Sequence, residues 1–235
     1  MADNIVELVK QIKPSVVGIG TYNPLGSPRS NLQGTGFAIG DGTLIATNFH
    51  VVEKELEIET NETRVVFIGQ GSDPKLAPAE IIATDPAHDI AILRIKEKVQ
   101  PLTLSEDKFI DDGLEVAFTG FPIGAILGLY PATHKGLIAA LTPVVIPSSN
   151  AGQLSIEMMK RLRDPFFVYQ MDATAFPGNS GSPVYDTTSG KVVAIINKVF
   201  IQKTKEAAIT DPSGISYSIP VRHLRALAKS ISVNI

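Results

Sequence analysis

Short apolar segments, separated by glycine, proline and asparagine, dominate the first half of the chain. Between Val16 and Ile95 about seven of them have the length and residue types of β-strands. They are VVGIGTY, GTGFAI, TLIATN, ELEIET, RVVFIG, AEIIAT and DIAILRI. Because no long helical pattern separates these segments, they favour a closed antiparallel barrel over a sheet of alternating strands and helices.

A second set of strand-like segments follows an acidic, turn-rich linker at 99–113, VQPLTLSEDKFIDDG. The set consists of LEVAFTG, HKGLIAAL, FFVYQMDA, SPVYD, KVVAIINKVF and ISYSI. The sequence therefore predicts an all-β protein with an N-terminal domain over 1–113 and a C-terminal domain over 114–235.

Helical spacing of apolar residues occurs near both ends of the chain. The first pattern covers 3–12 and stops at Pro14, and the second covers 220–232, where Pro220 suits a helix start. A third segment, SIEMMKRLRD at 155–164, contains good helix formers inside the long connection 143–165. Two interpretations of this insert stay open: a gate beside a cleft, or a surface insertion without a catalytic role.

Composition excludes several classes of function. The chain has 235 residues, 44% of them hydrophobic, a net charge of −3 and no cysteine. We therefore expect no nucleic-acid partner, and no disulfide, thiolate zinc site or thiol catalysis. No apolar run reaches the roughly 20 residues that cross a bilayer, and the N-terminus lacks a signal pattern, so we expect no membrane anchor. The compartment stays open: cytoplasmic, unless a leader was removed.

No cofactor or metal is expected either. Gly34, Gly36 and Gly40 miss the glycine spacing of dinucleotide-binding turns, and no helix follows them. His88 and His134 have no cysteine or acidic companions at the spacing of metal ligands.

One serine stands between two glycines in AFPGNSGSPV, residues 175–184. Ser180 is either part of a tight turn or a nucleophile, and a serine hydroxyl attacks only when a neighbouring base takes its proton. His50 in LIATNFHVV follows an apolar strand, and Asp89 in TDPAHDIAILRI opens one. Taken alone, each of the three residues has an ordinary structural explanation.

Together the three residues run in the order His, Asp, Ser, which is the order in chymotrypsin-like β-barrel proteases. The strings around them, GTGFAIGDGTLIATNFHVV, DIAILRI, GFPIG, QMDATAFPGNSGSPVYD and ISYSIPVRHL, make this specific. From about residue 5 to about residue 230 the chain resembles the protease domain of the HtrA family, within the trypsin-like superfamily. No PDZ-like domain follows in the sequence.

The resemblance implies two antiparallel six-stranded β-barrels with short terminal helices. It implies His50 as the general base, Asp89 as the residue that orients it, and Ser180 as the nucleophile. The turn Gly178, Asn179 and Ser180 resembles the oxyanion hole, with the amides of Gly178 and Ser180 as donors. Asn179 is neutral, so we expect no activation by an ion pair with a newly cut N-terminus.

Specificity and assembly are also implied by the resemblance. The family reads the bottom of its primary pocket six residues before the nucleophile, here Thr174, which is neutral. We therefore expect small or medium apolar residues, not Arg or Lys, before the scissile bond. The family also suggests a homotrimer, a periplasmic location and polypeptide substrates.

Two functions remain open from the sequence. The first is a serine endopeptidase that cuts unfolded or exposed protein segments through an acyl-enzyme. The second is a protease-like module that is latent, or that binds peptides or unfolded chains without cutting them.

Overall fold

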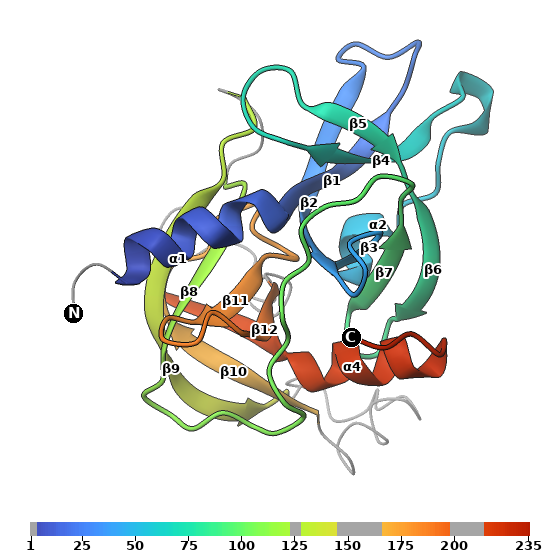
Figure 1. Cartoon of the computed structure of the whole chain (residues 1–235). Helices are drawn as coiled ribbons and strands as arrows, with labels where there is room; N and C mark the ends of the chain where they lie inside the picture. The colour runs from blue at the N-terminus through green and yellow to red at the C-terminus, as the bar shows by residue number, and fades with distance from the viewer. Residues whose placement is uncertain (1–3, 123–127, 145–165, 198–213) are drawn as a thin grey trace, which may run out of the picture.

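A computed structural model describes residues 4–122, 128–144, 166–197 and 214–235. The predicted all-β class is confirmed, because strands dominate these ranges and form two units (Figure 1). The insert 155–164, with its proposed gate, lies outside the described residues.

The first unit is a seven-stranded antiparallel sheet in the order β5-β4-β1-β2-β3-β7-β6. Its strands are β1 (Val16–Tyr22), β2 (Ser30–Ile39), β3 (Leu44–Thr47), β4 (Thr63–Ile68), β5 (Lys75–Pro78), β6 (Glu80–Asp85) and β7 (Ile90–Arg94). The interior of this unit is built from buried aliphatic side chains such as Val17, Ile45 and Leu93.

This sheet has one strand more than the six expected. Its two edge strands, β5 and β6, are consecutive in the chain and separated only by Ala79, whose N–H donates to the carbonyl of Arg64. Pro78 has no N–H to contribute to a ladder, so one extended stretch divides into two strands. The first half pairs with β4 and the second with β7, and the chain itself joins the two edges.

The strand expected over 55–60, ELEIET, is not present. The structure has a short 3-10 helix there, Ile58–Thr60, and the Ile58 side chain is 88% exposed. Asn61 follows in the left-handed region with φ +54°, and its N–H donates to the Ile58 carbonyl. Local turn bonds replace the ladder bonds here, because no neighbouring strand covers the apolar residues of this segment.

The second unit is a closed barrel in the order β10-β13-β12-β11-β8-β9. Its strands are β8 (Glu115–Gly120), β9 (Ala132–Pro143), β10 (Phe167–Asp172), β11 (Pro183–Asp186), β12 (Val192–Asn197) and β13 (Ile215–Pro220). Every residue of β12 is buried, as its apolar sequence VVAIIN predicts. The predicted boundary at residue 113 falls between β7 and β8, and as a domain boundary it stays a prediction.

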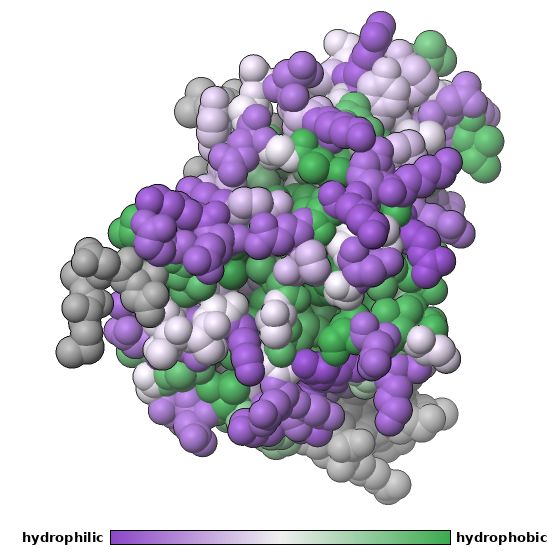
Figure 2. All heavy atoms as spheres, in the orientation of Figure 1, coloured by the Kyte–Doolittle hydropathy of each residue, from purple (hydrophilic) through white to green (hydrophobic). Residues whose placement is uncertain are grey.

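Helices pack where the two units meet. In α1 (Asn4–Ile12), Leu8 and Ile12 are buried, and Leu8 lies against Gly190 of the β11–β12 hairpin. The opposite face of α1 is hydrophilic in Figure 2. In α4 (Val221–Ser230), Arg225 donates hydrogen bonds to the carbonyls of Leu104 and Ser105 in the linker. A buried cluster that combines Phe37 and Ile92 with residues of the barrel and of α4 fills the space between the units.

Candidate active site

The predicted base lies on a single helical turn at the end of a strand. His50 belongs to α2 (Phe49–Val52), which follows β3 after Asn48. Val51 and Val52 are buried in the first unit and anchor this turn, while the His50 side chain stays 25% exposed. The end of β3 and the two buried valines hold the backbone of this turn, and the imidazole of His50 stays partly exposed.

Asp89 holds His50 at two points. Its Oδ1 accepts the backbone N–H of His50 at 2.8 Å, and its Oδ2 lies 2.6 Å from Nδ1 of the ring. A carboxylate at Nδ1 favours the tautomer with hydrogen on that nitrogen, which leaves Nε2 free to accept a proton. Asp89 adopts the left-handed conformation, φ +53°, and Nδ2 of Asn48 donates to its carbonyl at 3.0 Å.

A residue of the second unit completes this pair. Nδ2 of Asn197, the last residue of β12, donates to Oδ2 of Asp89 at 2.6 Å. The carboxylate therefore receives three hydrogen bonds, one of them across the boundary between the units. Nothing in the sequence around Asn197 predicts this contact, because a lone asparagine at the end of an apolar strand carries no local signal of it.

Ser180 lies in the loop between β10 and β11 and is buried, with 5% of its surface exposed. The loop turns at 176–179, where the N–H of Asn179 donates to the carbonyl of Phe176 at 3.1 Å. Gly178 has φ +94°, a conformation that glycine adopts without strain. Neither the N–H of Gly178 nor that of Ser180 donates a hydrogen bond to any residue that the structure describes.

The loop of Ser180 and the helix of His50 flank the same position of β2. Gly34 lies against the Val51 side chain and against the carbonyl of Ser180. The next residue, Thr35, donates its N–H to that carbonyl at 2.9 Å. Within the described ranges, the Ser180 hydroxyl makes no hydrogen bond to His50. Such bonds are often long without substrate and tighten only when it binds.

Two other predicted site residues, Asn179 and Thr174, lie on the same loop as Ser180. Asn179 is fully buried, and its carboxamide finds no hydrogen-bond partner among the described residues. Thr174 is half-buried between β10 and the turn, and its role in a specificity pocket stays a prediction. Residues 198–213, which follow Asn197, lie outside the described residues.

A second histidine–aspartate pair resembles the first. Nδ1 of His88 lies 2.6 Å from Oδ2 of Asp85, and the His88 N–H donates to Oδ1 at 3.2 Å. The His88 ring stacks on His223 of α4, with ring centroids 4.0 Å apart, and its edge meets Phe166. Burial, and next the neighbouring His88, lower the pKa of His223 to about 4.

His134 contacts the Ser180 loop from β9. Its ring stacks on Phe118 at 4.9 Å between centroids and lies 5.9 Å from the ring of Phe176. Burial lowers the pKa of His134, so the ring is neutral near pH 7. In the described part of the chain, no group of three or more histidine or acidic side chains is arranged to hold a metal ion.

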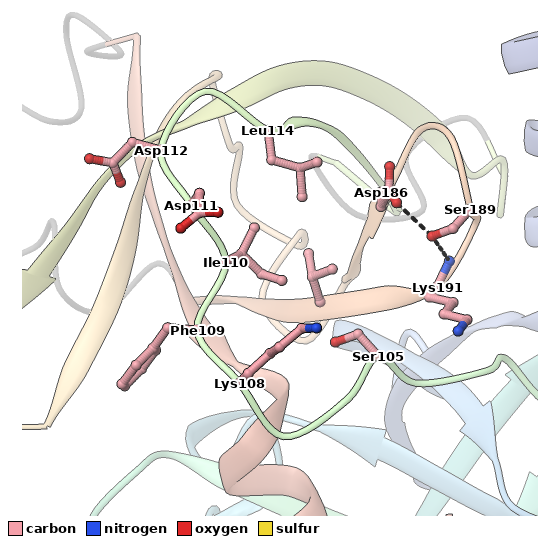
Figure 3. A pocket seen from close by; sticks show the side chains of 11 residues that line it. Ser105, Lys108, Phe109, Ile110, Asp111, Asp112, Leu114, Asp186, Ser189 and Lys191 are labelled. Carbon is pink, nitrogen blue, oxygen red and sulfur yellow. Dashed lines mark hydrogen bonds between the residues drawn. The ribbon is translucent and has the colours of Figure 1, made fainter.

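A pocket of about 390 Å³ lies between the linker and the β11–β12 hairpin (Figure 3). Lys108, Asp111 and Lys191 are among its lining residues, and Asp186 is held by the Ser189 hydroxyl at 2.6 Å. Charges of both signs line this pocket. It shares no residue with the His50, Asp89 and Ser180 constellation.

The model of the trypsin-like peptidase domain matches residues 34–195, a range that includes all three of these residues. The chain belongs to the trypsin-like peptidase family. The described helices include none that is long and apolar enough to cross a membrane.

The family members most similar to the chain include several HtrA-type proteins, which confirms the predicted resemblance. A probable periplasmic serine endoprotease, DegP-like, of Halomonas elongata is 29% identical over 80% of the chain and 32% of its own length. The serine protease Do-like HtrA of Bacillus subtilis is 25% identical, covering 98% of the chain and 49% of that protein. The serine protease PepD of Mycobacterium tuberculosis is 26% identical, with coverages of 97% and 46%. The chain thus spans a third to a half of these relatives.

Solved structures give the same fold. The active form of the Rv3671c protease from M. tuberculosis superposes with a TM-score of 0.67 at 23% identity, covering 97% of the chain and 85% of that protein. An HtrA-type protease with a tripeptide also gives a TM-score of 0.67, at 21% identity, with coverages of 97% and 63%. The trypsin-like fold of this family member is therefore established.

Proposed function

We propose that the chain is a serine endopeptidase that hydrolyses polypeptides through an acyl-enzyme, with His50, Asp89 and Ser180 as its catalytic residues. The observation that carries the proposal is the doubly held His50–Asp89 pair beside the loop of Ser180. The two unpartnered amides of that loop support it further, because an oxyanion hole needs donors that the protein itself leaves free.

The reaction follows from these positions. Nε2 of His50 takes the proton of the Ser180 hydroxyl as its oxygen attacks the scissile carbonyl carbon. Asp89 stabilises the imidazolium that forms, and the amides of Gly178 and Ser180 bind the developing oxyanion. His50 then protonates the leaving amine, and a water molecule repeats the sequence to release the acyl group.

Substrate preference rests on Thr174. A neutral residue at this position offers no carboxylate to an Arg or Lys side chain, so Val, Ala or Leu should precede the scissile bond. Several relatives are named probable periplasmic serine endoproteases, and we propose the periplasm and a homotrimer as the compartment and assembly to examine first. A light-scattering mass measures the assembly.

Digestion of unfolded casein by the chain and by Ser180→Ala tests the function. We expect casein cleavage by the unmodified chain, a loss of about 10⁴-fold or more in the variant, and mapped cuts mostly after small apolar residues. Casein that stays intact with the unmodified chain favours the non-cleaving module, for which the missing bond between Ser180 and His50 is the one favourable observation. A majority of cuts after Arg or Lys would contradict the role of Thr174 alone.

A further inference from the structure

The turn at 176–180 has few anchors of its own. Within the turn, the N–H of Asn179 donates to Phe176, and from outside it the N–H of Ser182 donates to Asn179. Just after the turn, the N–H of Gly181 donates to the Ile196 carbonyl of β12 at 3.0 Å. The buried side chains of Asn179 and Ser182 find no hydrogen-bond partner among the described residues. None of these bonds reaches the carbonyl of Gly178, which needs a partner from outside the turn.

Thr35, in β2 of the first unit, supplies that hold. Its hydroxyl donates to the carbonyl of Gly178 at 2.7 Å and accepts the N–H of Phe121 at 3.1 Å. Its own N–H donates to the carbonyl of Ser180 at 2.9 Å, and its carbonyl accepts the hydroxyl of Thr47 at 2.7 Å. Thr35 is fully buried, and among the described residues it has the only side chain that hydrogen-bonds the turn.

The two carbonyls that Thr35 holds limit where the free amides can point. The carbonyl of Gly178 belongs to the peptide plane between residues 178 and 179, and that of Ser180 to the plane between 180 and 181. The amides of Gly178 and Ser180 belong to the two planes that alternate with these. The plane of the Gly178 carbonyl lies between the two planes that carry the free amides, so a hydrogen bond to that carbonyl restricts the rotation of both neighbours. The plane of the Ser180 amide is also held by the bond from Ser182 N–H to the Asn179 carbonyl.

Glycines make room for this contact. A Cβ on Gly181 would overlap the carbonyl of Thr35, and a Cβ on Gly120 would overlap the hydroxyl of Ser182 and crowd that of Thr35. Both positions therefore require the absence of a side chain. These two glycines thus allow β2 of the first unit to approach the Ser180 loop of the second unit closely.

We propose that the Thr35 hydroxyl is a positioning residue for the oxyanion hole, acting from the first unit on the Gly178 carbonyl of the second. The inference rests on the proposed endopeptidase function. Thr35 touches no reacting atom, so loss of its hydroxyl should lower the stabilisation of the transition state and leave substrate binding unchanged.

Thr35→Val tests this, because valine keeps the shape and the backbone N–H and removes only the hydroxyl. Thr35→Ser restores the hydroxyl, and Thr119→Val is the matched control. Thr119 is also fully buried, and its hydroxyl also has two partners, the hydroxyls of Thr133 and Tyr185, neither of them in the turn. The substrate is a fluorogenic peptide copied from a mapped casein cleavage site.

For Thr35→Val we expect kcat to fall about 10- to 100-fold with KM and the pH midpoint of kcat/KM nearly unchanged, less than the loss of an oxyanion donor itself. Thr35→Ser and Thr119→Val should stay within about threefold of the unmodified chain. If Thr35→Val does not fold, Thr35→Cys replaces it, because a cysteine S–H is only a weak hydrogen-bond donor. We expect its kcat to lie below that of Thr35→Ser, about 3- to 10-fold below that of the unmodified chain.

Several results would overturn the proposal. A Thr35→Val kcat equal to that of Thr119→Val, a rise in KM alone, or a Thr35→Ser variant as slow as Thr35→Val would each exclude a positioning role for the hydroxyl. So would a Thr35→Cys variant as fast as Thr35→Ser. These outcomes leave the endopeptidase proposal standing, whereas an unmodified chain that fails to cut casein overturns both.

Discussion

Two histidine–aspartate pairs of the first unit have nearly the same internal geometry. In His50–Asp89 and in His88–Asp85, Nδ1 lies 2.6 Å from a carboxylate oxygen, and the other oxygen accepts the histidine N–H. The pairs differ in their surroundings. Asn197 of the barrel bonds the first carboxylate, whereas His88 packs its ring on His223 and Phe166.

An imidazole held by a carboxylate is therefore not by itself a sign of a catalytic base. The His50 pair lies beside the loop that carries the Ser180 hydroxyl and two free amides, so in the proposed reaction Nε2 has a nucleophile to deprotonate. The ring face of His88 is covered by another imidazole, and no nucleophile of the described chain is bonded to it. Location beside the barrel loop, and not pair geometry, is what distinguishes the pair that we propose as catalytic from the second pair.

The largest expected effect comes from exchanging the two histidines for alanine. His50→Ala should lower kcat/KM on casein-derived peptides by about 10⁴-fold or more, because base and nucleophile act as a unit. His88→Ala removes an equally held imidazole and serves as the matched control, with activity within about threefold of normal. A comparable loss for His88→Ala would reverse the assignment of the two pairs.

A smaller loss is expected from the bond that distinguishes the first pair. Asn197→Ala removes the donor from the second unit to Oδ2 of Asp89, so the carboxylate should hold His50 less firmly. We expect kcat to fall about 10- to 100-fold with the fold retained. Steady-state kinetics with a circular dichroism control measures this, and an unchanged kcat would show that Asp89 needs no support from the barrel.

The smallest effect concerns stability and the second pair. The pKa of His223 is lowered by burial, and next by His88, to about 4 from an ordinary 6.5. Between pH 4 and pH 6.5, His223 is therefore protonated in the unfolded chain and neutral in the folded chain. Stability from the neutral ring is complete above pH 6.5 and is lost as the pH falls towards 4, by about 1–2 kcal/mol given the partial exposure of the ring.

Urea unfolding at pH 7.5 and pH 5.0 measures this loss, with His223→Gln as the variant that cannot titrate. The unmodified chain should lose more free energy of unfolding between the two pH values than the variant does. Equal losses would mean that His223 is protonated as readily in the folded chain as in the unfolded one.

Much of this molecule could be read from its sequence, because strands and motif residues carry local signals. Alternation and turn residues marked most strands, and the strings around His50, Asp89 and Ser180 marked the family. The strand predicted at 55–60 was wrong, because the alternating apolar residues there have no neighbouring strand to pair with and Ile58 is exposed. Thr35 and Asn197 could not be found, since both act through hydrogen bonds across the two units, and such contacts leave no pattern along the chain.

The most direct test of the central claim is covalent labelling of Ser180 by a fluorophosphonate probe, located by mass spectrometry. An activated serine reacts, whereas an ordinary surface or turn serine does not. We expect a single adduct on Ser180 in the unmodified chain and in His88→Ala, and none in Ser180→Ala or His50→Ala. An unlabelled Ser180 in the unmodified chain, or a label that persists in His50→Ala, would contradict it.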